Sequence, residues 1–466
     1  MDAVLKCTLC GREREPFPPA SRCDVCGGIL DYVYDYSEVK LTYSEMQGIW
    51  KYYQVFPRIS EKSIVSMGEG GTPLRSARRL ASIVNAEKVF LKDETTNPTG
   101  SYRDRAASLI VSNALDSGTK KLVCASYGNF GASAAAYCAR AGIECTIITP
   151  RRVNIGKLAQ MYIYGGRIIR SGETIDDAIA EAERVVDGCY QATPELNPLS
   201  VEAQKTISYE ILEACREVDL IIVPTGTGNT AYSIWKGIKE CLVFGIADTA
   251  PRLVLVQPDG CATLFNEEGK VKLRKIEKPT SAASPLISLN PVYGWLAARA
   301  VEESGGFVVN VTDKEILEAE KLLAKNEGIF SELASAASIA CLKKAREEGL
   351  IDRSEVVICL ITASGLKDPY VVEALADSEK MGVRPRGGFK TKLEILRFLE
   401  IGDSYGYEIW KAIGKRLSIQ AVYQHLDDLQ QRGLVEVYYK EKRKYFRLTQ
   451  KGKRVVEALD EISSLL

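Results

Sequence analysis

The stretch Asn97-Pro-Thr-Gly-Ser-Tyr-Arg-Asp-Arg105 stands near the start of a long region, about residues 63–380, where short apolar runs alternate with amphipathic segments. The runs have the length of buried strands, and the amphipathic segments carry apolar residues at helical spacing. This alternation predicts an α/β fold, a parallel sheet with helices on both faces, whose ligands bind beyond the carboxyl ends of the strands. The expected strands are Leu122–Ser126, Cys145–Pro150, Leu220–Pro224, Leu253–Gln257 and Val356–Thr362.

Helices are expected between these strands, and loops of unusual composition follow three of them, at 126–133, 224–230 and 362–368. Thr312 and Glu315 have the spacing of a capping box at the start of one helix. Loops 126–133 and 224–230 are rich in small residues, and each leads into a helix, whose first N–H groups suit a phosphate. Many such turns bind nothing. The expected helices include Ala132–Ala141, Ile175–Val186 and Lys314–Lys325.

Five motifs in this order resemble those of fold-type II pyridoxal-phosphate (PLP) enzymes, threonine synthases above all. Besides 97–105 they are Gly68-Glu-Gly-Gly-Thr-Pro-Leu74, Glu202-Ala-Gln-Lys-Thr206, Glu327-Gly-Ile-Phe330 and Gly365-Leu-Lys-Asp368. The resemblance implies a two-domain body like the tryptophan synthase β chain over residues 46–380, a cofactor cleft between the domains, and a homodimer. It further implies cofactor contacts from Asn129, Gly226, Thr227, Gly228, Asn229, Thr230 and Thr362, and ligand contacts from Ser101, Arg105, Ser126, Tyr127 and Phe130.

The pattern breaks at Arg103, which stands where the family has its Schiff-base lysine. A lysine amine loses its proton in a desolvated site and attacks the cofactor aldehyde, whereas a guanidinium stays protonated and is a very poor imine former. Arginine instead makes paired hydrogen bonds to a phosphate or carboxylate. We therefore expect PLP, if bound, to be held noncovalently. The alternative is that Lys92 or Lys205 replaces the lost lysine.

Three further departures fall on the loops that the resemblance assigns to the site. Tyr127 and Phe130 replace small hydroxyl residues and would fill the space of a substrate amino acid. Asn229 stands where a glycine is usual and restricts the backbone. Ala363 and Ser364 follow Thr362 in place of the usual glycine and histidine or asparagine, while Thr362 itself is retained.

Residues 1–45 contain two Cys-x-x-Cys pairs, which predict a zinc ribbon. Each pair can direct two thiolates to one tetrahedral ion, and four protein ligands leave no open position, so the zinc would be structural. The remaining readings are four unpaired thiols or a redox pair. The ligands would be Cys7, Cys10, Cys23 and Cys26.

Composition and charge restrict the function further. The single histidine, His425, excludes histidine-based catalysis in the body, and the other nine cysteines read as small buried hydrophobes. No charged-then-apolar leader and no membrane-length apolar run is present, which predicts a cytoplasmic protein. The chain is neutral with 61 basic and 61 acidic residues, but residues 384–466 hold 17 Lys/Arg against 11 Asp/Glu. A basic tail on an acidic body suggests that only the tail meets a polyanion.

After a Gly- and Arg-rich linker, 381–389, residues 390–466 predict a winged helix: three short helices, a hairpin with a cationic tip and a last helix at 449–466. The second helix is expected to be capped by Ser404. The third, Ser418–Arg432, turns His425 outward, and the last has an apolar stripe that suits dimerisation.

The tail resembles PadR-like transcription regulators. The resemblance implies that the third helix enters the major groove and that the hairpin tip contacts phosphates. Winged helices also bind proteins, and a lysine-rich tip is often only a solvated turn. The implied DNA contacts are Ser418, Gln420, Tyr423, Gln424, Lys440, Lys442, Arg443 and Lys444.

The leading hypothesis is a catalytically degenerate, ligand-responsive transcription regulator that senses an amino-acid-related or phosphorylated metabolite. An active threonine synthase, or a related β-eliminating lyase, with a regulatory tail is the alternative. A scaffold without catalysis, using both ends for contacts, is a third. The ligand, the operator and the direction of regulation do not follow from the sequence.

Overall fold

The computed structural model describes residues 3–17, 21–36, 39–151, 153, 155–185, 188–368, 388–414, 418–440 and 443–456. The chain divides into two compact units, residues 1–369 and 370–466. All but the last two residues of the expected linker 381–389 lie outside the described residues. No helix within the described ranges is long and apolar enough to cross a membrane.

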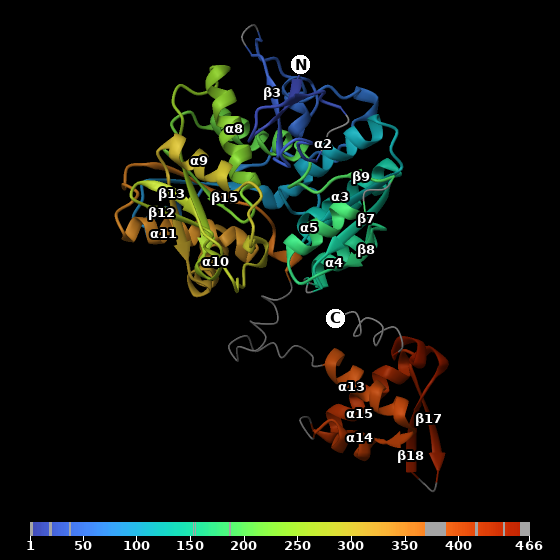
Figure 1. Ribbon diagram of the computed structural model, residues 1–466. Helices are drawn as coiled ribbons and strands as arrows, with labels where there is room; N and C mark the ends of the chain where they lie inside the picture. Colours follow the sequence, from blue (N-terminus) through green and yellow to red (C-terminus); the bar gives the residue numbers. More distant parts are fainter. Residues whose placement is uncertain are drawn as a thin grey trace. The chain divides into compact units, whose positions relative to one another are not determined.

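The first unit is built around a six-stranded sheet in the order β14-β11-β10-β15-β5-β4, parallel except for β4. Alternate residues of β10 enter different cores: Ile221 and Val223 face one, Leu220 and Ile222 the other. Figure 1 shows why, because α8 and α9 lie on one side of this sheet and α10 and α11 on the other. The strands are β4 (Leu74–Ser76), β5 (Lys88–Asp93), β10 (Leu220–Pro224), β11 (Arg252–Pro258), β14 (Phe307–Val311) and β15 (Val356–Ile361).

A second parallel sheet of four strands has the order β8-β7-β6-β9. Leu122 and Cys124 of β6 enter the largest core with α2 and α3, while Val123 and Ala125 pack toward α5. Both sheets are therefore covered on two faces, as parallel sheets require. The strands are β6 (Lys121–Ala125), β7 (Glu144–Thr149), β8 (Arg167–Arg170) and β9 (Tyr190–Gln191).

The helices and the smaller strand pair of this unit complete its layers. The α-helices are α1 (Arg78–Ile83), α2 (Arg103–Asp116), α3 (Asn129–Ala141), α4 (Ile155–Ile163), α5 (Ile175–Arg184), α6 (Leu199–Gln204), α7 (Thr206–Ala214), α8 (Asn229–Val243), α9 (Gly294–Ser304), α10 (Asp313–Glu327) and α11 (Leu333–Glu347). The 3-10 helices are η1 (Gly48–Val55), η2 (Glu61–Ser63), η3 (Glu94–Thr96), η4 (Asp259–Cys261), η5 (Ser284–Leu286) and η6 (Gly365–Lys367), and the pair is β12 (Leu264–Glu267) with β13 (Lys270–Leu273).

The five strands expected from the sequence all form, with ends that shift by a residue or less. Helix α3 begins three residues earlier than expected, because Gly128 adopts φ 142° and turns the chain into it. The capping box at Thr312 and Glu315 is confirmed, with both reciprocal hydrogen bonds present. Val186, the expected end of α5, lies outside the described residues.

The N-terminal sheet β2-β1-β3 is antiparallel and packs on the body through buried charges. Asp31 of β3 accepts a 2.8 Å hydrogen bond from Lys236 of α8, and Tyr34 donates a 2.6 Å hydrogen bond to Glu202 of α6. A buried charge is costly unless paired, so these contacts hold β3 in one position. The strands are β1 (Ala3–Cys7), β2 (Glu13–Arg14) and β3 (Leu30–Tyr34).

The second unit packs its helices around one apolar core, next to a sheet in the order β16-β18-β17. The helix cap expected at Ser404 is wrong. Ser404 lies in β16 and pairs with Phe446 of β18, and Tyr405 is the residue at the N-cap of α14. Residues 450–456 are helical, and the rest of the expected last helix lies outside the described residues. The elements are α13 (Gly388–Ile401), β16 (Ser404–Tyr405), α14 (Gly406–Ala412), α15 (Ile419–Gln431), β17 (Val435–Lys440) and β18 (Arg443–Leu448).

Candidate functional site

A cleft in the first unit gathers the ends of several strands and the starts of several helices. It is lined by the start of α2, the loop between β6 and α3, the loop between β10 and α8, and Thr362 after β15. In parallel sheets the carboxyl ends of the strands lie at one edge, which is why distant loops meet there. Of the predicted site residues, it brings together Ser126, Tyr127, Asn129, Phe130, Gly226, Thr227, Gly228, Asn229, Thr230 and Thr362.

Arg103 is the first residue of α2 and lies in the wall of this cleft. Its Nη2 is 3.7 Å from Oε1 of Glu195, and its guanidinium carbon lies 4.9 Å from the centre of the Tyr102 ring. Nη1 is buried and makes no hydrogen bond with any described residue. The two N–H groups of Nη1 are thus unpaired within the described part of the chain.

Lys157 and Glu332 form a second charged pair in the cleft, and the sequence analysis predicted neither residue. Lys157 Nζ lies 3.1 Å from Glu332 Oε1, and each side chain is 2% exposed. Glu332 Oε2 accepts a 2.8 Å hydrogen bond from Asn129. Oδ1 of Asn129 accepts no hydrogen bond from the described residues, and Oε1 of Glu332 is engaged through the ion pair with Lys157.

Gly128 explains how Lys157 reaches the cleft. A Cβ at this glycine would lie 2.4 Å from Cδ of Lys157, so the lysine chain occupies the space that any other side chain would take. The only signal in the sequence was a lysine in an otherwise uncharged segment, Ile155-Gly-Lys-Leu-Ala159. That signal does not say which side of α4 faces a ligand.

The glycine-rich loop 226–230 ends at the N-terminus of α8. The first N–H groups of a helix have no partner within it, and the helix dipole adds positive potential there. The side chain of Asn229 is directed away, since its Oδ1 accepts 2.7 Å from Gln204 and its Nδ2 donates to Ser200. Thr227 donates 3.1 Å to Glu195, which places a carboxylate beside the loop.

Three predicted ligand residues from the loop between β6 and α3 line the cleft in different ways. Ser126 Oγ accepts 2.9 Å hydrogen bonds from the N–H groups of Gly128 and Gly131 and so shapes the loop. Phe130 is 4% exposed and Tyr127 is half-buried, and burial raises the pKa of Tyr127 to about 12. The hydroxyl of Tyr127 therefore stays protonated.

Ser101 and Arg105 do not line the cleft. Ser101 is fully buried, and its Oγ accepts from the backbone N–H of Arg103. Arg105 is fully buried between two carboxylates, with Nε 2.8 Å from Glu94 and Nη2 2.8 Å from Glu210. Both residues thus support the cleft wall from behind.

Lys92 and Lys205, the two lysines considered as replacements, also lie away from the cleft. Lys92 Nζ is 2.6 Å from Glu210, and Lys205 Nζ is 2.6 Å from Glu202. Both side chains are 1% exposed or less. Each is therefore committed to a buried ion pair.

Thr362 is 7% exposed and lines the cleft beyond β15. Its hydroxyl lies 2.8 Å from that of Ser335, and either oxygen can donate. Behind this strand end, burial lowers the pKa of Lys367 to about 8, although nearby Glu332 and Asp104 oppose the shift. Lys367 Nζ donates 2.7 Å to the carbonyl of Thr99 and does not line the cleft.

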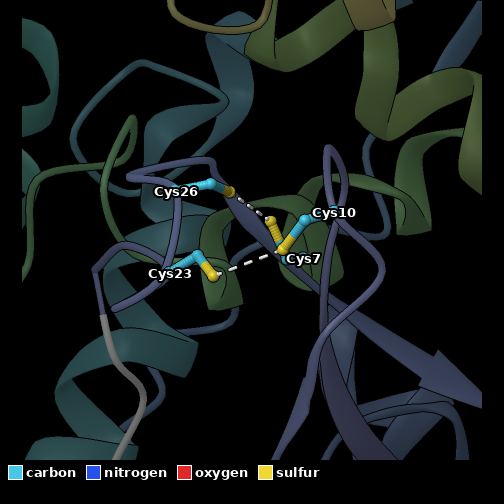
Figure 2. Close-up of side chains that lie close together, drawn as sticks. All are labelled: Cys7, Cys10, Cys23 and Cys26. Atoms are coloured by element: carbon cyan, nitrogen blue, oxygen red, sulfur yellow. Dashed lines mark hydrogen bonds between the residues drawn. The ribbon is translucent and has the colours of Figure 1, made fainter.

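The four N-terminal cysteines form one cluster, shown in Figure 2. Their sulfur atoms all lie within 4.8 Å of one another, close enough to hold a metal ion. The sulfurs of Cys7 and Cys26 are 3.4 Å apart and those of Cys10 and Cys23 3.7 Å, so the two pairs of the sequence interleave. The other nine cysteines are buried or half-buried, consistent with small core residues.

In the second unit, α15 exposes Gln420 and Gln424, as expected for a reading helix. Ser418 is its N-cap, and the side chain accepts from the N–H of Ala421. Tyr423 is half-buried, with its ring 6.3 Å from that of Phe446. His425 is also half-buried, and burial together with the charge of Lys392 lowers its pKa.

The basic hairpin tip joins β17 and β18. Lys440 and Arg443 are exposed, and Lys442 lies outside the described residues. Lys444 Nζ lies 3.6 Å from Oδ1 of Asp427 on α15, which reduces the positive charge that it presents. The tip and α15 are thus linked through an ion pair.

Comparison with known families agrees with this geometry. Residues 65–363 match the family model described as pyridoxal-phosphate dependent enzyme. The chain belongs to that family. Residues 395–458 match the transcriptional regulator PadR-like family, so the C-terminal domain is PadR-like.

Curated relatives of this PLP-enzyme family member include two archaeal proteins called threonine synthase. That of Methanocaldococcus jannaschii is 39% identical over 377 residues, 78% of this chain and 93% of the relative. That of Methanosarcina acetivorans is 37% identical over 381 residues, 79% and 93% of the two chains.

Solved structures share the fold at lower identity. Maize serine racemase superposes with a TM-score of 0.56 at 24% identity, covering 66% of this chain and 93% of that one. A threonine deaminase from Solanum lycopersicum gives 0.58 at 20% identity, covering 72% and 91%. These likenesses establish the fold alone.

Proposed function

We propose that the chain is a DNA-binding transcription regulator whose threonine synthase-like body binds a small ligand and has lost catalysis. Arg103 carries the proposal, because it lies in the cleft wall. The resemblance of residues 97–105 to the family motif supports its standing where the family has the Schiff-base lysine. A guanidinium does not form the imine on which PLP chemistry depends. Occupancy without turnover then reports ligand concentration to the DNA-binding tail.

The residues present fit PLP held without a covalent bond. The 226–230 loop at the start of α8 would hold its phosphate, and Asn129, whose Oδ1 accepts no hydrogen bond from the described residues, and Thr362 would hold the ring. When bound, PLP supplies an aldehyde and an electron-withdrawing ring. The chain supplies a binding site for that group but no amine at position 103.

The environment of Lys157, a lysine that lines the cleft, also supports the loss of covalent chemistry. Its Nζ lies 3.1 Å from Glu332 Oε1, and both side chains are 2% exposed. Relocated covalent chemistry would therefore have to break this ion pair first.

In the second unit, exposed Gln420 and Gln424 suit base edges, and Lys440 and Arg443 suit phosphates. Ser418 already caps α15, and Lys444 already pairs with Asp427. We therefore assign both residues to the DNA phosphate backbone and not to base edges. A homodimer would present two such heads to a two-fold symmetric operator.

The cysteine cluster is proposed to hold structural zinc. A tetrahedral ion with Zn–S distances of about 2.3 Å requires sulfurs about 3.8 Å apart. The observed pairs at 3.4 and 3.7 Å are close to that spacing. Zinc would stabilise β1 and β3, the strands that carry the first ligand and the charged contacts to the body.

The test is DNA binding by the full chain to the region upstream of its own gene. We expect a salt-sensitive footprint that changes when PLP or an amino-acid metabolite is added, and a weaker sequence preference in Gln424→Ala. Arg299→Gln, which removes an arginine that is 63% exposed on α9, should behave as the parent. A protein with covalently tethered PLP that turns over an amino acid would refute the proposal.

The alternative is an active threonine synthase, or a related β-eliminating lyase, with a regulatory tail. The 39% identity to a protein of that name over 93% of its length favours it. Release of threonine or phosphate from O-phosphohomoserine, with PLP added, would establish this alternative. Absence of both products alongside regulated DNA binding would favour the regulator.

A further inference from the structure

Ile29 links the cysteine cluster to the rest of the first unit. It comes shortly after Cys26 in the sequence, and its carbonyl accepts hydrogen bonds from the N–H of Thr8 at 3.0 Å and from the Thr8 hydroxyl at 2.9 Å. Thr8 follows Cys7 directly, so the backbone of Ile29 is held by both Cys-x-x-Cys turns. A metal ion bound by all four sulfurs holds these two turns together and would thereby fix Ile29.

The side chain of Ile29 packs into a small core that is separate from the ribbon. This core contains Val201 of α6, Tyr293 at the N-cap of α9, and Leu296 of α9. Ile29 is 5% exposed and the other three are 4% exposed or less. Because protein interiors are close-packed, a displacement of one side chain is passed to its neighbours. The position of Ile29 therefore affects both α6 and the start of α9.

The start of α9 holds one side of the glycine-rich loop 226–230. The backbone N–H of Tyr293 donates a 2.9 Å hydrogen bond to the carbonyl of Thr227. A Cβ at Gly228 would lie 2.8 Å from the carbonyl oxygen of Tyr293, so the two backbones touch with no side chain between them. The position of Tyr293 thus sets the position of the middle of the loop.

Helix α6 holds the other side of the loop. Gln204 donates a 2.7 Å hydrogen bond to Oδ1 of Asn229 and accepts one of 3.1 Å from Thr230. These two residues begin α8, whose first N–H groups are the ones that we propose for a phosphate. The loop is therefore held from both sides by elements that Ile29 contacts.

Strand β3, which follows Ile29, adds a third connection to α8. Asp31 accepts a 2.8 Å hydrogen bond from Lys236 and a 2.6 Å one from Tyr232, both of α8. Lys236 also donates 2.6 Å to Glu202 of α6. Breaking a buried ion pair is costly, so β3, α6 and α8 keep one relative position.

We propose that the cysteine cluster controls the affinity of the cleft for phosphate-bearing ligands. When its four cysteines hold zinc, Ile29 is fixed, α6 and the start of α9 are fixed with it, and the glycine-rich loop keeps its binding geometry. A preorganised loop loses less freedom on binding, so the ligand binds more tightly. Linkage requires the ligand to raise the zinc affinity by the same factor. The inference goes beyond the proposed function and rests on one part of it, phosphate binding at the loop.

The test is PLP binding by the full chain, measured by equilibrium dialysis on zinc-loaded protein freed of unbound zinc and on protein stripped by a chelator. The zinc-free form should bind PLP about 5- to 150-fold more weakly, the range usual for coupling between two sites. Zinc affinity, measured by competition with a zinc indicator, should rise by the same factor when PLP is present. Equal PLP affinity of the two forms, or no PLP binding by either, would overturn the inference.

Ile29→Ala tests whether Ile29 is the positioning residue. This change removes the packing on Val201 and Tyr293 but alters no cysteine and no residue of the cleft. The variant should still bind one zinc, and its PLP affinity should no longer depend on zinc. The matched control is Val33→Ala on β3, which removes methyl groups from a side chain that is 42% exposed and should keep the zinc dependence of the parent.

The outcomes separate this inference from the proposed function. A zinc dependence that persists unchanged in Ile29→Ala would overturn the inference. Regulated DNA binding without any zinc effect on PLP affinity would likewise overturn it, and would leave the proposed function standing. Covalent PLP with turnover would refute the proposed function, while the zinc dependence of PLP affinity could still be measured.

Discussion

Replacing Glu210 by glutamine tests whether Arg105 is a structural residue or a ligand-binding one. Glu210 accepts hydrogen bonds from Arg105 at 2.5 and 2.8 Å and from Lys92 at 2.6 Å. All three side chains are 8% exposed or less. Glu210→Gln leaves two buried cations with only Glu94 as a carboxylate partner.

Breaking a buried ion pair by removing one partner costs about 3–5 kcal/mol. With an unfolding entropy of about 2.1 cal/mol/K per residue, a unit of 369 residues should lose about 4–6 °C in melting temperature. The matched control is Glu213→Gln, on the same helix, whose pair with Lys51 is 21% and 39% exposed. A partly exposed pair contributes about 0–1 kcal/mol, so this variant should melt within about 1 °C of the parent.

The difference between parent and Glu210→Gln should also depend on pH. Burial alone would raise the pKa of Glu210, but the charges of Arg105 and Lys92 outweigh it and hold the pKa well below the usual value. A depressed pKa stabilises the fold above the unfolded-state value of about 4.3 and loses that effect as the pH falls below it. Melting curves at pH 7 and 5 should therefore show the same difference, and at pH 3.5 a smaller one.

Measuring the ligand affinity of Glu210→Gln tests whether Arg105 has a structural role. If Arg105 only supports the wall, Glu210→Gln should retain ligand affinity at temperatures where it is folded. A variant that melts like the parent but loses ligand binding would refute the structural assignment. It would return Arg105 to the ligand-binding role expected from the sequence.

Three further predictions concern the cofactor, the DNA and the metal. Arg103→Lys restores an amine at the cleft wall, so borohydride with PLP should add one covalent PLP by mass, whereas the parent should add none; labelling of the parent would contradict the argument. Arg443→Ala should lower the slope of log K against log salt by about 1, and Lys444→Ala by less, because Asp427 already neutralises part of its charge; equal effects would count against that ion pair. Chelation, or Cys26→Ser, should release one equivalent of zinc and lower the melting temperature, and a metal content of zero in the parent would exclude the ribbon as a zinc site.

Local patterns in the sequence were enough to predict much of the architecture. Strand β10 and helix α10 appear where apolar periodicity and the capping box at Thr312 indicate, because these signals depend on neighbours within a few residues. The glycine-rich loop at 226–230 also begins a helix as expected. The helix cap predicted at Ser404 was wrong, because the pairing of β16 with β18 overrides the tendency of a serine to cap a helix.

The sequence by itself determined the element types, the family and the guanidinium at position 103, all of which are properties of short stretches. Only the tertiary structure decided which charges face the cleft. Arg105 turns away from it because Glu210, 105 residues further along the chain, lies behind α2, and Lys157 enters it because Gly128 leaves room. A long charged side chain is buried at low cost only where an opposite charge lies beside it. That opposite charge comes from a residue remote in sequence, so the direction of the side chain is decided only when the chain folds.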